Sequence, residues 1–142
     1  MAAWIDKHLE EYVRNCFPDR FVSAYHKSGT WQTSRYIQVS TCLKEEKHIH
    51  YEYYQEHIEL HLEDKFQSED YRQFAKELRQ QTSRNPKLSW HSWQGRSQCR
   101  CRLDAPVHDW GAVVNSLKEI VAIFDELIKN AYNAKKRIPQ TF

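Results

Sequence analysis

The stretch HIHYEYYQEHIELHLED, residues 48–64, decides the fold predicted for this chain. Read at a period of two residues, it contains two strands, with apolar side chains at positions 49, 51 and 53 and again at 58, 60 and 62. Only Gln55 and Glu56 are left to form the turn, so Tyr51 is expected to face Leu60 across the hairpin. Gln-Glu is not the Asn-Gly pair that tight hairpins favour, and a longer loop would shift this register.

The other side of this hairpin collects histidine and glutamate side chains. In the two-residue register His50 faces His61, and Glu52 faces Glu59. Residues paired in this way have Cβ atoms about 5 Å apart, so two imidazoles can converge on one ion with the carboxylates beside it. The predicted metal ligands, a set that suits Zn, Mn or Fe, are therefore His50, His61, Glu52 and Glu59. A solvated sheet face with ordinary ion pairs is the alternative.

Three segments have the periodicity of amphipathic helices. Apolar residues recur at intervals of three and four over residues 4–16, 71–78 and 109–134, and Ser68 is the predicted cap of the middle helix. The basic tail from about residue 135 is expected to fray, as chain ends commonly do.

A second hairpin is predicted at residues 88–103, with Gly95 and Arg96 as its turn. Glycine at the first central position is what a type II′ turn requires. This register places Trp93 opposite Gln98 on the same side of the sheet as the histidines and glutamates.

Together these elements predict the fold class. Period-two segments at residues 21–26 and 31–43 add two strands before the first hairpin. We therefore expect one α+β domain over residues 1–142, with the order α-ββββ-α-ββ-α. Its single antiparallel sheet of about six strands would carry the helices packed on one face.

The composition is that of an ordinary soluble chain. A net charge of +2 at pH 7 gives no strong attraction to nucleic acid or to an anionic membrane. No apolar run of about 18 residues and no leader pattern occurs, so no membrane partner is expected. The four cysteines include no CxxC pair, which predicts reduced thiols and a cytoplasmic location.

Several residues predicted on the outer sheet face are of the types that anchor interfaces or stack on bases: Tyr54, His91, Trp93, Arg100 and Arg102. The leading hypothesis is a non-catalytic binding module without a cofactor. It would recognise a protein or a nucleic acid through this exposed face of aromatic, arginine and histidine side chains.

The order of the elements carries a resemblance. The hairpin of residues 48–64, a helix, the strand LSWHSW, an arginine-bearing strand and a long last helix resemble a small bacterial domain of unknown function. That domain accompanies PD-(D/E)XK nucleases and restriction-type defence proteins. The resemblance covers residues 36–128 and implies that Glu52 stands at the first metal-binding acid. It also implies that Glu59-Leu60-His61 stands at the triplet of acid, any residue and lysine.

The resemblance leads to an alternative function, a metal-dependent hydrolase or nuclease. Its catalytic residues would be Glu52, Glu59 and His61, with a divalent metal as cofactor. His61 stands in place of a lysine that helps activate water, and histidine is a weaker, pH-dependent cation. The resemblance therefore implies an association with nucleases more than cleavage by this chain.

Overall fold

The computed structural model describes residues 5–26 and 33–137. Its strands form one open antiparallel sheet in the order β1-β3-β4-β5-β7-β6, with β2 also paired to β3. The strands are β1 (Ile5–Asp6), β2 (Val22–His26), β3 (Thr33–Ser40), β4 (Ile49–Tyr54), β5 (His57–Leu62), β6 (Leu88–Trp93) and β7 (Arg96–Leu103). The helices are α1 (Lys7–Cys16), α2 (Arg72–Gln81) and α3 (Trp110–Arg137), with 3-10 turns η1 (Asp64–Gln67) and η2 (Glu69–Tyr71).

The α+β class and the predicted order of helices and strands are confirmed. The two-residue strand β1 was not predicted, because two residues are too few to show a period. Residue 4 of the first predicted helix and residues 31–32 of the predicted long strand lie outside the described residues.

The predicted register of the first hairpin is confirmed. Tyr51 pairs with Leu60 and His50 with His61, as the two-residue turn requires. Gln55 and Glu56 both have positive φ angles, of 50° and 64°, which is the conformation of a type I′ turn.

The predicted turn of the second hairpin is wrong by one residue. Trp93 pairs with Arg96 instead of Gln98, so that Gln94 and Gly95, with φ of 48° and 80°, form the turn. An irregularity in β7 restores the predicted pairing further along, where His91 meets Arg100. Gln98 has a φ of 49° and donates its backbone N–H to Ser92 Oγ at 3.0 Å.

The predicted start of the middle helix is also wrong. The Ser68 hydroxyl donates to the Lys65 carbonyl at 2.7 Å and does not cap a helix, and α2 begins only at Arg72. Phe66 accounts for the later start of the helix, because its ring is buried. The ring centroid of Phe66 lies 4.7 Å from that of Tyr71 and 4.8 Å from that of Phe74. The 3-10 turns place Phe66 in the core, and the helix that follows has no side-chain cap.

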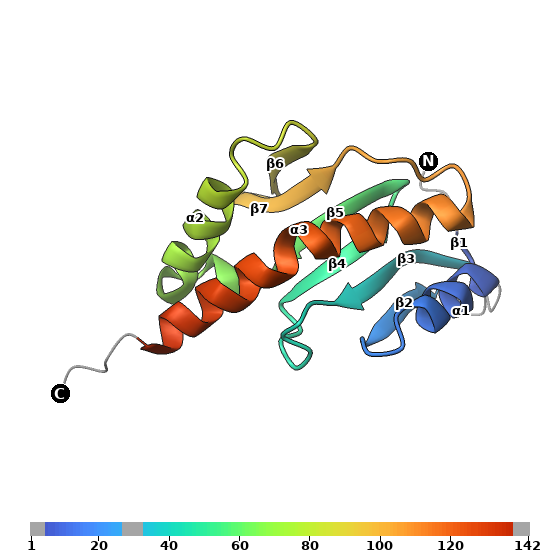
Figure 1. Ribbon diagram of the computed structural model, residues 1–142, viewed down its shortest axis with the longest axis horizontal. Coiled ribbons are helices and arrows are strands. Elements are labelled where there is room, and N and C mark those ends of the chain that lie inside the picture. Colours follow the sequence, from blue (N-terminus) through green and yellow to red (C-terminus); the bar gives the residue numbers. More distant parts are fainter. Residues whose placement is uncertain (1–4, 27–32, 138–142) are drawn as a thin grey trace.

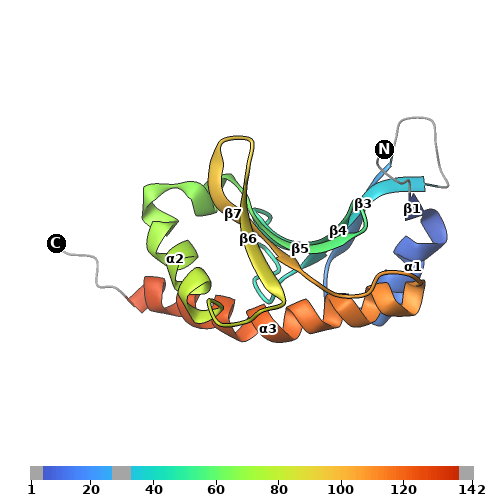
Figure 2. The same cartoon turned by 90° about the horizontal axis from the view of Figure 1, so that it is seen from above.

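Helix α3 lies across one face of the sheet, and α1 and α2 lie on the same side towards its two ends (Figure 1). Its buried stripe includes Leu117, Ile120, Phe124 and Ile128. Phe124 meets Trp90 of β6 edge-on, with ring centroids 5.9 Å apart. The predicted position of the helices on one face is thus confirmed (Figure 2).

The last helix continues to Arg137, three residues beyond the predicted end. Lys135, predicted to belong to a frayed tail, donates to the Asp70 carbonyl at 2.9 Å and lies 4.4 Å from the centroid of the Tyr71 ring. This end of α3 is therefore attached to η2. Residues 138–142 lie outside the described residues.

All four cysteines are free thiols. Cys99 and Cys101 are buried in the core. Burial raises the pKa of Cys101 to about 12, so this thiol stays protonated and behaves as a small apolar side chain.

Candidate functional site

The sheet is strongly curved, and its concave face is turned away from α3 (Figure 2). The predicted metal ligands occupy the centre of this face on β4 and β5. They are not solvated, since the exposed fractions are 7% for His50, 4% for Glu52 and 1% for both Glu59 and His61. The expectation of an exposed face is therefore wrong at its centre.

His61 connects the two central carboxylates. Its Nε2 is 2.8 Å from Glu59 Oε1, and its Nδ1 lies against Glu52 Oε2. His50 approaches the same Glu52 oxygen through Nε2 at 2.9 Å, while its Nδ1 is 3.3 Å from the Lys47 carbonyl. The cross-strand pairs predicted from the register thus form one continuous network.

Glu59 is held from the other side by two basic residues. Arg102 on β7 reaches Glu59 Oε2 through Nε at 2.9 Å and through Nη2 at 2.8 Å. His91 on β6 places Nε2 3.4 Å from the same oxygen. Both carboxylate oxygens of Glu59 therefore already have partners, as expected for an Arg-Glu pair on neighbouring strands.

The electrostatics of this network keep the carboxylates charged. Burial alone would raise the pKa of both acids, but the imidazoles of His50 and His61 outweigh it at Glu52 and lower its pKa to about 2. His61 and Arg102 do the same at Glu59, whose pKa is also about 2. Against the opposing effect of burial, Glu52 and Glu59 raise the pKa of His61. Buried groups perturbed in this way occur both in functional sites and in structural ion-pair networks.

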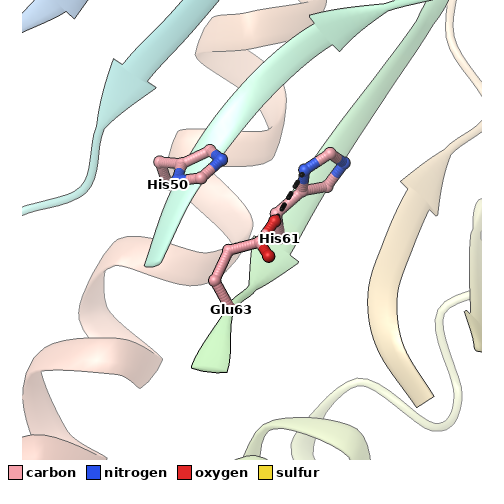
Figure 3. A group of neighbouring side chains, drawn as sticks. All are labelled: His50, His61 and Glu63. Carbon is pink, nitrogen blue, oxygen red and sulfur yellow. Dashed lines mark ion pairs between the residues drawn. The ribbon is translucent and has the colours of Figure 1, made fainter. Parts of the chain in front are cut away.

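Glu63 joins the site, although it was not predicted as a ligand. It follows β5 directly, and its Oε1 is 3.6 Å from His61 Nδ1 (Figure 3). One ligand atom each from His50, His61 and Glu63 lie within 4.8 Å of one another. The alternation of Glu59, His61 and Glu63 along the chain was the signal that could have identified it.

The predicted binding residues form a layer beside this network. The guanidinium carbon of Arg100 is 4.0 Å from the centroid of the Trp93 ring and 5.8 Å from that of Tyr54. Tyr54 meets Trp93 edge-on at 6.4 Å. The exposed fraction of the side chain is 11% for Arg100, 32% for His91 and 40% for Arg102. The five predicted residues are thus brought together, but as a half-buried layer instead of an open surface.

No protein-family model, curated protein or solved structure matches this chain. The resemblance to a nuclease-associated domain therefore stays a prediction, as do the catalytic roles of Glu52, Glu59 and His61, which lie side by side in the network. Within residues 5–26 and 33–137 no helix is long and apolar enough to span a membrane.

Proposed function

We propose that this chain is a non-catalytic binding module whose concave sheet face recognises another protein. The stack of Arg100 on Trp93, with Tyr54 edge-on to the same ring, is the observation that supports this most directly. Tryptophan, tyrosine and arginine are the residue types that dominate the energetics of protein interfaces. Here all three gather beside the buried network of histidine and glutamate, and Trp93 also packs against the apolar core.

The charges of this face favour a protein over a nucleic acid as the partner. Arg102 is paired with Glu59, and Arg96 lies 3.1 Å from Glu63 and 2.6 Å from Asp64. Affinity for nucleic acids comes largely from basic side chains that neutralise phosphates. These two guanidinium groups already have carboxylate partners, whereas a protein interface accommodates such mixed charges at its rim.

The buried network supports this face by fixing its side chains. Arg102 keeps 40% of its side chain exposed, while only 1% of the Glu59 side chain is exposed. A buried carboxylate holds the exposed guanidinium in one orientation, so less side-chain entropy is lost when a partner binds. If the resemblance to the nuclease-associated domain holds, the partner is the nuclease that the module accompanies.

Affinity capture with matched variants tests this proposal. Tagged protein with Trp93→Ala and Arg100→Ala is compared with wild type and with a control carrying Lys118→Ala and Glu126→Ala, two exposed positions on α3. We expect a protein that wild type and control both bind. Loss of two interface anchors should weaken its binding to the double variant at least about tenfold.

Circular dichroism and thermal unfolding show whether the double variant keeps its fold. Arg100→Gln alone leaves the contact of Tyr54 with Trp93 in place and serves as a milder second variant. Capture of the same proteins by the folded variants and wild type would overturn the proposal. Salt-dependent binding of nucleic acid that both variants lose would identify a nucleic acid as the partner instead.

A further inference from the structure

We infer that His50, His61 and Glu63 form a binding site for a divalent transition-metal ion, with zinc as the ion that this ligand set fits best. The inference goes beyond the proposed binding function and does not depend on it. Two imidazoles and one carboxylate are donors that zinc prefers, and three protein ligands leave a fourth position for another donor.

The donor atoms already converge on one point. One ligand atom of each side chain lies within 4.8 Å of the others, and His61 Nδ1 is 3.6 Å from Glu63 Oε1 (Figure 3). Zinc bonds of about 2.0–2.1 Å in a tetrahedron place ligand atoms about 3.3 Å apart. Side-chain adjustments of about 1 Å therefore suffice to seat an ion, and the strands need not move.

His61 carries the second, independent observation. Only 1% of its side chain is exposed, and its Nδ1 is paired with Glu52 Oε2 but lacks the geometry of a hydrogen bond. Its other nitrogen, Nε2, is held by Glu59 at 2.8 Å. Histidines that bind metals use this arrangement, in which a carboxylate holds the N–H of one nitrogen and the other nitrogen offers its lone pair to the ion. His61 Nδ1 faces the side of the ring on which Glu63 lies.

Glu63 has one oxygen for an ion and one for a supporting residue. Its Oε2 accepts a hydrogen bond from Arg96 at 3.1 Å, while Oε1 faces His61 Nδ1 at 3.6 Å and lies 4.0 Å from Arg100 Nη2. Arg96 thus orients the Glu63 carboxylate just as Glu59 orients the His61 ring. This assigns Glu59, predicted from the sequence as a ligand, to the supporting shell.

Glu52 is placed to supply the fourth donor. Its Oε2 lies against His61 Nδ1 and 2.9 Å from His50 Nε2, between the two imidazoles. The charges agree with this role. Arg102 balances Glu59 and Arg96 balances Glu63, whereas Glu52 has only imidazoles beside it. A divalent cation bound there would place a positive charge directly beside Glu52.

Titration of metal-stripped protein tests the site. We expect wild type to bind one equivalent of Zn²⁺ by calorimetry, with a rise of several degrees in the thermal midpoint at saturating zinc. Co²⁺ should bind in competition with Zn²⁺ and give the visible absorption of a low-coordinate site. His50→Gln and Glu63→Gln should each weaken binding by at least about 100-fold, since each removes a ligand. His48→Gln, an exposed position just before β4, should leave binding unchanged.

Unfolding in chelator shows whether each variant is folded before metal is added. Glu63→Gln keeps the test decisive if His50→Gln does not fold, because 28% of the Glu63 side chain is exposed and the amide keeps its shape. Failure of wild type to bind at millimolar zinc would overturn the inference. So would stoichiometric binding that persists in folded Glu63→Gln or that is lost in His48→Gln.

Discussion

A single carboxylate, that of Asp125, fastens α3 to the sheet. Its Oδ1 accepts the hydroxyl of Tyr51 at 2.6 Å and the backbone N–H of Cys42 at 3.3 Å, and its Oδ2 accepts from Arg20 at 2.5 Å. Burial and the neighbouring Asp125 charge raise the pKa of Tyr51, so its phenol stays protonated as a donor. A buried hydroxyl of this kind depends on its acceptor.

Asp125→Ala is expected to lower the free energy of unfolding by about 2–4 kcal/mol, since it leaves the buried Tyr51 hydroxyl without its acceptor and removes one of the acceptors of Arg20. Tyr51→Phe should cost only about 1 kcal/mol, because it removes the hydroxyl together with the need for a partner. Urea unfolding of both variants and of the double variant measures the coupling. Costs that add without an interaction energy would show that the two residues are independent.

Single site residues could be predicted where strand alternation alone decides their place. The pair His50 with His61 follows from the predicted register and is present, whereas Glu59 and Arg102 belong to two hairpins whose mutual register was not predicted. Alternation places Glu63 on the same face as Glu59 and His61, but the orientation of its carboxylate also depends on Arg96 reaching it from β7. Side-chain reach between elements is not contained in a periodic pattern.

At the level of the elements, both hairpin turns use backbone conformations that ordinary side chains disfavour. Gln55 and Glu56 have φ angles of 50° and 64°, in the left-handed region. Such angles cost roughly 1 kcal/mol for residues other than glycine, asparagine and aspartate. The strand pairs on either side hold the turn in place against this cost.

Replacing Gln55 and Glu56 by Asn and Gly should therefore raise the free energy of unfolding by about 1 kcal/mol. Glu45→Gly, in a loop where φ is not positive, should be neutral or destabilising, because glycine there only adds entropy to the unfolded chain. Urea unfolding provides the comparison. A lower stability for the Asn-Gly variant would mean that the two side chains contribute more than their backbone strain costs.

The second hairpin was predicted less well than the first, because the alternation along its strands is interrupted. The first has unbroken alternation on both strands, so only one register buries its apolar face. In the second, the irregularity between His91 and Trp93 moves the turn by one residue. Glycine at position 95 fits either a type I′ or a type II′ turn, and the sequence carries no signal for the bulge.

The burial of the site depends on the shape of the whole sheet and not on any single strand. Alternation placed His50, Glu52, Glu59 and His61 on one face, and a flat sheet would have left that face wet. In the curved sheet (Figure 2) the Tyr54 ring lies 6.4 Å from the His61 ring, measured between centroids, and the exposed fraction is 7% or less for the four. Twist and bulges accumulate over many strands, so this shape could not be read from any one segment.

One core cluster joins buried residues of α1, the sheet, α2 and α3, which is the basis for predicting that the chain unfolds as one cooperative domain. Phe124→Ala should cost about 3–5 kcal/mol, because the ring is fully buried against Trp90. Lys118→Ala, exposed on the same helix, should change stability by less than about 0.5 kcal/mol. Tryptophan fluorescence, far-UV circular dichroism and amide exchange in α1 should then report one shifted midpoint. If α1 and β2 kept the wild-type midpoint in Phe124→Ala while the rest of the chain unfolded earlier, the chain would consist of two separate folding units. A single cooperative domain requires the midpoints of all elements that share the core to shift together.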